Sequence, residues 1–191
     1  MTDSPILPYH QRTGARMLGT AGSTLLTYGD VPAEYRAGLD DAIILDCTDR
    51  GMVHVSGADA LEFLHHITSC DVHALRKGQG NAGLLLDGKG KVLQMFDLAR
   101  SAEDRFELST PPGQAAELIA ALDMYIFTED VQLSDESEGH APIDMVGSHA
   151  GMVLGSVVGE VPEALLHHFE TVESDWGPLR ITNLPVLGTA G

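Results

Sequence analysis

The most informative stretch of the sequence runs from Ala82 to Leu98 and reads AGLLLDGKGKVLQMFDL. Two largely apolar segments, residues 82–86 and 91–98, flank a short loop with an Asp-Gly step and a second glycine, which is typical of a β-hairpin. The Gly-Lys-Gly-Lys of this loop is not a phosphate-binding loop, because a strand follows it where such a loop needs Ser or Thr and a helix. The stretch therefore predicts two neighbouring antiparallel strands.

Strand and helix patterns alternate on both sides of this hairpin. Residues 52–56 alternate like a strand, and an amphipathic helix is expected from Ser56 onward. After the hairpin come a strand at 105–109, a long helix at 114–127 and a strand at 131–134. Helices mixed with hairpin-linked strands predict an α+β fold with the helices on one face of a sheet.

The two ends of the chain carry weaker patterns. Residues 1–40 form an irregular lead-in with apolar anchors, and the apolar run at 42–47 is expected to make a hairpin with 52–56. Beyond Gly139 we expect a strand at 143–146, a helix from Ser148 through Val157, a helix from Pro162 with Leu165, Leu166 and Phe169 inside, and strands at 171–174 and 179–182.

Charge and composition limit the classes of function. The chain has 191 residues, and its 28 acids against 11 bases give a net charge of −17, which argues against binding to phosphate backbones or anionic lipid. An anionic ligand would need a local basic pocket, and the only dense supply of cations is Arg76, Lys77, Lys89, Lys91 and Arg100. The alternative is that these five are solvated turn residues.

Targeting and redox signals are sparse. The N-terminus lacks a basic start and an apolar core, and no stretch approaches the roughly 20 apolar residues of a membrane span, so we expect a cytoplasmic protein. Cys47 and Cys70 lack metal-site spacing and are expected to be reduced thiols.

Catalytic and metal-binding motifs are also sparse. The adjacent pairs His65-His66 and His167-His168 diverge on a helix and are poor partners for one metal. Asp97 is the one unusual carboxylate, because alternation puts it on a face with Leu93 and Met95, which we expect to look inward. Such an acid is buried with a partner or lies at a pocket edge; the alternative is that the strand is an edge and Asp97 touches water.

Several stretches in order resemble the superfamily of the glycine-cleavage T-protein and YgfZ. They are Leu7-Pro8-Tyr9-His10, Thr13-Gly14-Ala15-Arg16-Met17, Tyr28-Gly29-Asp30-Val31-Pro32, Leu45-Asp46 with Arg50-Gly51, Val55-Ser56-Gly57-Ala58-Asp59, Asp71-Val72, Gly88-Lys89-Gly90-Lys91-Val92 and Val146-Gly147-Ser148-His149-Ala150. Each is weakly specific, and their common order covers about 150 residues.

The resemblance implies a fold and a ligand. It implies a ferredoxin-like lobe at 52–138 inserted in a second α+β lobe formed by 1–51 and 139–191, without the family's C-terminal portion. It also implies a tetrahydrofolate derivative as cofactor, bound at the centre of a three-lobed molecule.

The resemblance also implies site residues. The family's transferases place two adjacent aspartates where this chain has Gln94 and Met95. A folate-facing tyrosine of the family falls near Ala82 and an asparagine near Thr110, while Asp97 is out of register by two. These losses argue against aminomethyl transfer.

Three functions follow as hypotheses. The Gly-Lys-Gly-Lys hairpin is similar to the YgfZ branch, which implies a folate-binding protein that assists iron–sulfur cluster assembly or repair. The alternatives are an aminomethyltransferase-like one-carbon enzyme and a binding module that has lost the folate chemistry. A small-molecule folate is the expected partner, with a protein partner or a missing C-terminal lobe completing the molecule, since the family's later Lys-Gly-Cys-Tyr segment is absent.

Overall fold

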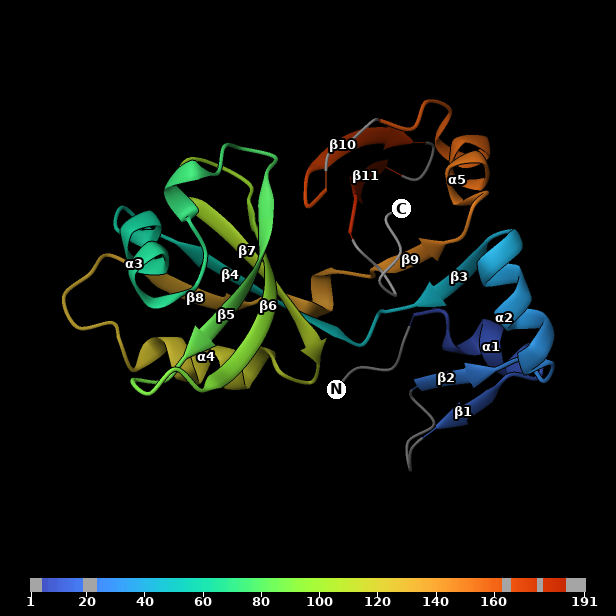
Figure 1. Cartoon of the computed structure of the whole chain (residues 1–191), viewed down its shortest axis with the longest axis horizontal. Helices are drawn as coiled ribbons and strands as arrows, with labels where there is room; N and C mark the ends of the chain where they lie inside the picture. Colours follow the sequence, from blue (N-terminus) through green and yellow to red (C-terminus); the bar gives the residue numbers. More distant parts are fainter. Residues whose placement is uncertain (1–4, 19–23, 163–165, 175–176, 185–191) are drawn as a thin grey trace.

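The computed structural model describes residues 5–18, 24–162, 166–174 and 177–184. The described helices and strands fall into two halves, with a hairpin between them (Figure 1). In chain order they are α1 (Leu7–Arg12), β1 (Arg16–Leu18), β2 (Thr24–Thr27), α2 (Val31–Asp40), β3 (Ile43–Asp46), β4 (Arg50–Ser56), α3 (Ala60–Ile67), η1 (Val72–Ala74), β5 (Gly80–Leu86), β6 (Val92–Arg100), β7 (Arg105–Pro112), α4 (Ala115–Asp123), β8 (Gln132–Asp135), η2 (Ser137–Gly139), β9 (Ile143–Val146), α5 (Ala150–Val158), β10 (Phe169–Ser174) and β11 (Gly177–Thr182).

The central sheet has five strands in the order β5-β6-β7-β4-β8, and all neighbours are antiparallel. The order of β6, β7, β4 and β8 is that of a ferredoxin-like βαββαβ unit, to which β5 adds an edge strand. The predicted α+β class, the 82–98 hairpin and the strand–helix alternation around it are confirmed. The helix predicted at 114–127 is shorter, because α4 ends at Asp123.

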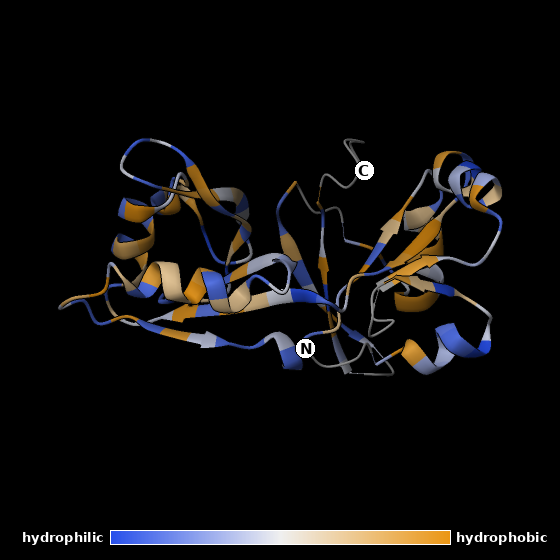
Figure 2. Ribbon diagram, turned by 90° about the horizontal axis from the view of Figure 1, so that it is seen from below, coloured by the Kyte–Doolittle hydropathy of each residue, from blue (hydrophilic) through white to orange (hydrophobic). Residues whose placement is uncertain are grey.

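The core lies between this sheet and its two helices. Alternate residues of β4, β6 and β7 point to α3 and α4, and Figure 2 shows largely hydrophobic ribbons for both helices. Leu64, Leu118 and Leu122 of the helices are fully buried against Val53, Val55, Phe106 and Leu108 of the strands. The opposite sheet face is free of these helices, and we call it the open face.

The predicted hairpin between residues 42–47 and 52–56 is wrong. β4 pairs with β7 along one edge and with β8 along the other, so no edge of β4 remains for β3. β3 pairs instead with β9, a strand about a hundred residues later in the chain, with Ile43 opposite Val146. Each edge of a strand can form hydrogen bonds with only one neighbouring strand. In β4, the long-range pairings with β7 and β8 occupy both edges.

The lead-in is attached to β3 through a buried histidine. His10 contacts the Tyr28 hydroxyl through Nδ1 at 2.7 Å and Asp46 Oδ2 through Nε2 at 2.8 Å. Asp46 Oδ1 also accepts hydrogen bonds from the backbone and hydroxyl of Thr48. Three stretches that carried the family resemblance thus meet in one hydrogen-bond network, which supports the prediction that the lead-in wraps a core.

The C-terminal third differs from expectation at one helix. The helix predicted at 148–157 is α5, and the predicted final strand pair is β10 and β11. The helix predicted from Pro162 falls partly outside the described residues, since 163–165 are not described. Its far end is not helical, because Leu166 and His167 form a turn and Phe169 begins β10.

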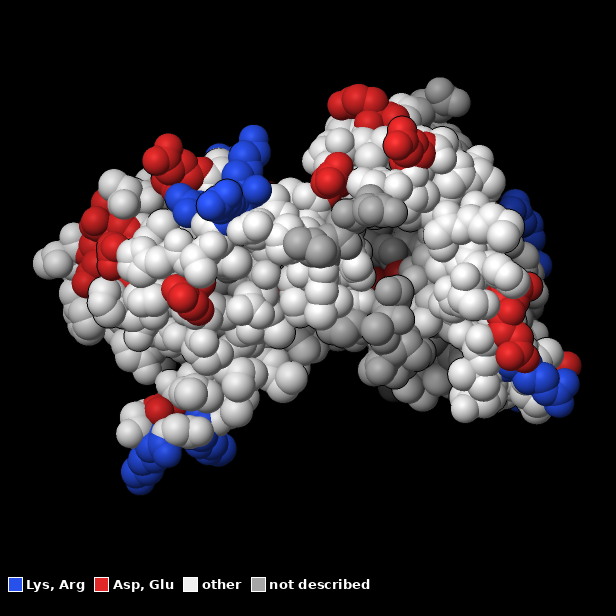
Figure 3. Space-filling model, turned by 45° about the horizontal axis from the view of Figure 1, so that its top comes forward, with Lys and Arg blue, Asp and Glu red and all other residues white. Residues whose placement is uncertain are grey.

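Among the described residues no helix is long and apolar enough to cross a membrane. Figure 3 shows acidic side chains scattered over both halves of the molecule and a hollow in the surface between them. Lysines and arginines gather in a few separate groups on this face.

Candidate functional site

The structure divides the predicted site residues between the two faces of the central sheet. Ala82 and Asp97 are directly opposite each other on β5 and β6, so their side chains share a face. Met95 lies two residues from Asp97 and therefore points the same way. These three residues lie on the open face, whereas Gln94 and Thr110 alternate with them and lie on the helix face.

Gln94 and Thr110 form hydrogen bonds within the protein on the helix face. The Gln94 amide donates to Glu117 of α4 at 3.4 Å, and its oxygen is buried without a partner among the described residues. The Thr110 hydroxyl is buried and donates to the Pro111 carbonyl. Neither side chain is brought together with Asp97.

Two expectations about β6 are corrected. Met95 is 59% exposed and Leu93 is also exposed, so they do not look inward. The helices pack on Phe96 and Leu98 instead, and alternation sends the odd-numbered residues to the open face. β6 lies between β5 and β7, so Asp97 is not on an edge strand, but its side chain is still partly exposed to solvent and lies near His167.

Asp97 lies in a charged environment. Its Oδ1 is 3.8 Å from Nδ1 of His167, and its side chain is 45% exposed. Burial raises the pKa of Asp97, His167 and Arg50 act in the opposite direction, and the charge of Asp144 adds to the increase. Desolvation therefore outweighs the nearby cations.

A second acid on the open face pairs with the hairpin between the two halves. Glu107 of β7 forms an ion pair with Arg180 of β11, whose guanidinium carbon lies 3.6 Å from the centre of the Phe169 ring. Burial lowers the pKa of Arg180 to about 10. His54 Nε2 lies 3.8 Å from Glu107 Oε1, and burial lowers the pKa of this histidine too.

A third pair joins β4 to β9. Arg50 donates to both oxygens of Asp144, at 3.1 and 2.6 Å. Cys47 lies nearby, and burial, reinforced by the Asp144 charge, raises the pKa of its thiol to about 11. Cys47 and Cys70 are both free thiols, as expected.

We call these seven charged or imidazole side chains the polar layer. Its members are Arg50, His54, Asp97, Glu107, Asp144, His167 and Arg180. A cavity of about 220 Å³ adjoins it, with Asp144 and Arg180 in its wall together with residues of β9, α5 and β11. This volume is below the roughly 300 Å³ of a small-molecule pocket, so it can hold only part of a folate-sized ligand.

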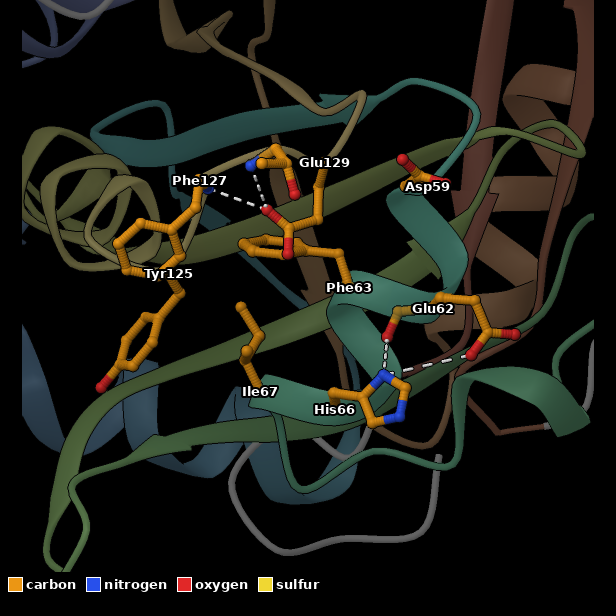
Figure 4. Close-up of a pocket in the computed structure, with 9 residues that line it drawn as sticks. Asp59, Glu62, Phe63, His66, Ile67, Tyr125, Phe127 and Glu129 are labelled. Carbon is orange, nitrogen blue, oxygen red and sulfur yellow. Dashed lines mark hydrogen bonds and ion pairs between the residues drawn. The ribbon is translucent and has the colours of Figure 1, made fainter.

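A larger cavity lies elsewhere, between α3 and the loop after α4 (Figure 4). It measures about 500 Å³ and contains none of the predicted site residues. Asp59, Glu62 and Glu129 contribute carboxylates to its wall, and no lysine or arginine does. Glu129 accepts hydrogen bonds from the backbone of Phe127 and Thr128, which lower its pKa and keep it charged. Like charges would repel an anionic folate from this cavity.

The cations expected to hold an anionic ligand lie outside the polar layer. Arg76, Lys77, Lys89 and Lys91 are exposed turn residues. Arg100 donates to the carbonyls of Leu75, Ala102 and Glu103 and has a structural role. Within the described ranges, no group of three or more His, Cys, Asp or Glu side chains is arranged to hold a metal ion.

Most members of the polar layer could not be recognised from the sequence. His167 looked like one of two ordinary histidines, and Arg180 followed an unremarkable Pro-Leu. Glu107 carried no signal either, since residues 105–109 alternate between polar and apolar and Glu107 falls on the polar face; Asp97, by contrast, interrupts the largely apolar strand at 91–98. An acid within such an apolar strand indicates a partner from another part of the chain.

Comparisons with known proteins agree with this architecture. Residues 7–183 match the family model described as the GCVT N-terminal domain. An aminomethyltransferase of Chlorobium luteolum is 26% identical over 195 residues, covering 100% of this chain and 53% of that protein. A sarcosine oxidase subunit alpha of Corynebacterium sp. (strain P-1) is 32% identical over 119 residues, covering 60% of this chain and 12% of that protein.

A solved structure of an aminomethyltransferase has a similar fold. The glycine cleavage system aminomethyltransferase T from Bartonella henselae matches with a TM-score of 0.83 and 26% identity, over 96% of this chain and 50% of that one. The chain thus spans about half the length of the aminomethyltransferases that it resembles.

Proposed function

Because the chain belongs to the GCVT N-terminal domain family, we propose that it binds a reduced folate and takes part in one-carbon transfer of the aminomethyltransferase type. The proposed site is the open face of the central sheet around Asp97. This reading replaces the iron–sulfur role as the leading hypothesis, since the relatives described above are named aminomethyltransferase and sarcosine oxidase subunit alpha.

Asp97 is the observation that carries the proposal. Charge builds on the folate amine as the methylene unit moves, and a carboxylate beside it stabilises that charge. Three acids belong to the polar layer, but Glu107 and Asp144 are bound to arginines and are only 11% and 10% exposed. Asp97 is 45% exposed, pairs with a histidine, and remains open to a ligand.

The surroundings of Asp97 fit a flat, partly polar ring. Ala82 and Met95 are exposed beside it, and Leu84 lies opposite Met95 on the same face. This gives an apolar floor, with a methionine that can adapt its shape to a ring. The buried nitrogens His54 Nε2 and His167 Nδ1 have no hydrogen-bond partner among the described residues, and such groups can orient a ligand.

The position of Asp97 differs from that of the family's paired aspartates. Gln94 and Met95 stand in their place, and Gln94 points to the helix face. Met95 and Asp97 share the open face two residues apart, which is about 7 Å along a strand. The folate amine would therefore bind two residues further along β6, nearer to His167, than the family resemblance implies.

A folate-binding role in iron–sulfur cluster assembly remains the second candidate. The replacement of both family aspartates by Gln94 and Met95 favours it, because a protein that only binds folate needs no carboxylate there. The lobe boundaries at 51/52 and 138/139, the cytoplasmic location and the need for a partner or further lobe also remain predictions.

Calorimetric titration with 5-formyltetrahydrofolate tests the binding proposal. We expect saturable binding, a clear loss of affinity in Asp97→Asn, and unchanged affinity in Asp123→Asn, an exposed aspartate at the end of α4. Absence of binding at millimolar ligand would overturn the proposal.

Formation of 5,10-methylenetetrahydrofolate from an aminomethyl donor separates the two candidates. A transferase should lose about 10²-fold in rate on Asp97→Asn, in line with the removal of one charge-stabilising group. Folate binding without any transfer would instead favour the iron–sulfur accessory role.

A further inference from the structure

The backbone of His167 has an unusual conformation next to the proposed site. His167 has a φ of 59°, and it is the one non-glycine residue with positive φ in the described part of the chain. Residues in this region are strained and persist where the surrounding structure holds them. Here the His167 N–H donates to the Asn183 carbonyl at 2.7 Å, and its own carbonyl lies against Gly80 so closely that a Cβ there would be 2.8 Å away.

This conformation directs the His167 imidazole to the open face. The side chain is only 14% exposed, and Nδ1 lies 3.8 Å from Asp97 Oδ1. Nδ1 is buried and has no hydrogen-bond partner among the described residues. At this distance the imidazole can attract the carboxylate electrostatically, but the two groups do not form a hydrogen bond. A small movement of either side chain, or a ligand atom between them, could complete the contact.

His167 is the imidazole that lies beside the Asp97 carboxylate, and it attracts that carboxylate when it is protonated. The groups that act on Asp97 are His167 from the turn before β10, Arg50 at the start of β4 and Asp144 in β9. Arg50 and Asp144 are bound to each other through both carboxylate oxygens, so their charges largely cancel at a distance. The protonated imidazole of the strained turn is thus the positive partner of Asp97 that no neighbouring acid balances.

We propose that His167 is the positioning residue of Asp97: its imidazole holds the carboxylate on the open face in its anionic form, ready for the amine of the ligand. The inference deepens the proposed folate function and rests on it. It assigns the turn before β10 a part in the site, although none of the stretches that carried the family resemblance lies there.

Two substitutions remove the His167 imidazole without making the positive φ of this residue harder to adopt. His167→Asn and His167→Gly both remove the imidazole, and Asn and Gly are the residues that adopt positive φ most readily, so both variants are expected to fold. His66→Gln, at an exposed histidine on α3, is the control. Thermal melting verifies folding of each variant.

The direct measurement is the titration of the Asp97 carboxyl by carbon-13 NMR, with the signal assigned by its loss in Asp97→Asn. We expect the pKa of Asp97 to increase in both His167 variants and to stay unchanged in His66→Gln. An unchanged Asp97 titration in both His167 variants would overturn the inference. This NMR titration needs no ligand, so it tests the role of His167 even if the chain does not bind folate.

The functional measurement is the affinity for 5-formyltetrahydrofolate between pH 5 and pH 8. We expect the His167 variants to bind about 3–10-fold more weakly than the unmodified chain at pH 5, with a smaller difference at pH 8, which lies further above the ordinary pKa of a carboxyl. A loss of affinity that is equal at all pH values would indicate a purely structural role and contradict the inference. No binding by the unmodified chain would reject the proposed function and leave the NMR result standing.

Discussion

Asp97 shows at the scale of one residue how stability and ligand binding can oppose each other. Burial favours the neutral carboxyl, while a ligand amine requires the charged form. The pKa of Asp97 is raised in the folded chain, so ionisation costs folding free energy as pH rises from the ordinary value through the raised one. That cost persists at neutral pH.

The first prediction concerns this cost. Asp97→Asn should increase the melting temperature at pH 7, by about 1–3 °C for a chain of this size, because it removes a charge that folding desolvates unfavourably. The gain should shrink as pH falls through the raised pKa and disappear well below the ordinary value of 3.8, where the carboxyl is neutral in both the folded and the unfolded state. Thermal melting from pH 3 to pH 8 checks the sign, and a lower melting temperature at pH 7 would show that the His167 pair outweighs desolvation.

At the scale of elements, the same corner occurs twice in the chain. Gly57 follows β4 and precedes α3, and Gly147 follows β9 and precedes α5. Both have a φ of 129°, and both carbonyls accept a hydrogen bond at 3.1 Å from the alanine three residues later. A Cβ would meet the Asp130 carbonyl at 2.0 Å in the first corner and the Asp41 carbonyl at 2.2 Å in the second. Each glycine thus lets a strand–helix corner dock on a distant backbone segment.

The second prediction compares two glycines. Gly57→Ala should destabilise the fold by about 2–4 kcal/mol, because it combines a disfavoured φ with a clash against rigid backbone. Gly151→Ala, in α5 with open space around its Cα, should be neutral or stabilise by up to about 1 kcal/mol. Urea unfolding measures both, and equal effects would contradict the role assigned to the corner.

At the scale of the whole molecule, a few ion pairs join segments that are far apart in the sequence. Arg50–Asp144 links β4 to β9, and Glu107–Arg180 links the central sheet to the β10–β11 hairpin. A backbone hydrogen bond from Phe169 to the Gly78 carbonyl adds to the second link. The polar layer is therefore both the proposed site and the connection between the two halves.

The third prediction tests this connection with a double-mutant cycle. Arg50→Met and Asp144→Asn should each destabilise the fold by about 1.5–3 kcal/mol, since each leaves a half-buried charged group unpaired. Their coupling energy should exceed about 1 kcal/mol. The exposed pair His149–Asp41, at 3.2 Å, is the control and should couple by less than about 0.5 kcal/mol. Similar coupling in both pairs would refute the special role of Arg50–Asp144.

The sequence by itself determined the local elements of the central sheet and the identity of its family. Asp87 to Gly90 specify a hairpin through turn chemistry, and the apolar period distinguishes strands from helices without knowledge of their partners. Asp97 was identified as unusual for the same reason, since an acid breaks an apolar strand pattern that is visible along the chain.

The tertiary structure alone decided which strands pair and which face of the sheet is free. β3 pairs with β9 because β7 and β8 occupy both edges of β4, and no local pattern records that competition. The packing of α3 and α4 sends Gln94 to one face and Met95 and Asp97 to the other. Arg180 reaches Glu107 from the β10–β11 hairpin, and His167 reaches Asp97 from the turn before it. The sequence states which residues can be charged, but only the fold sets the distance between two of them.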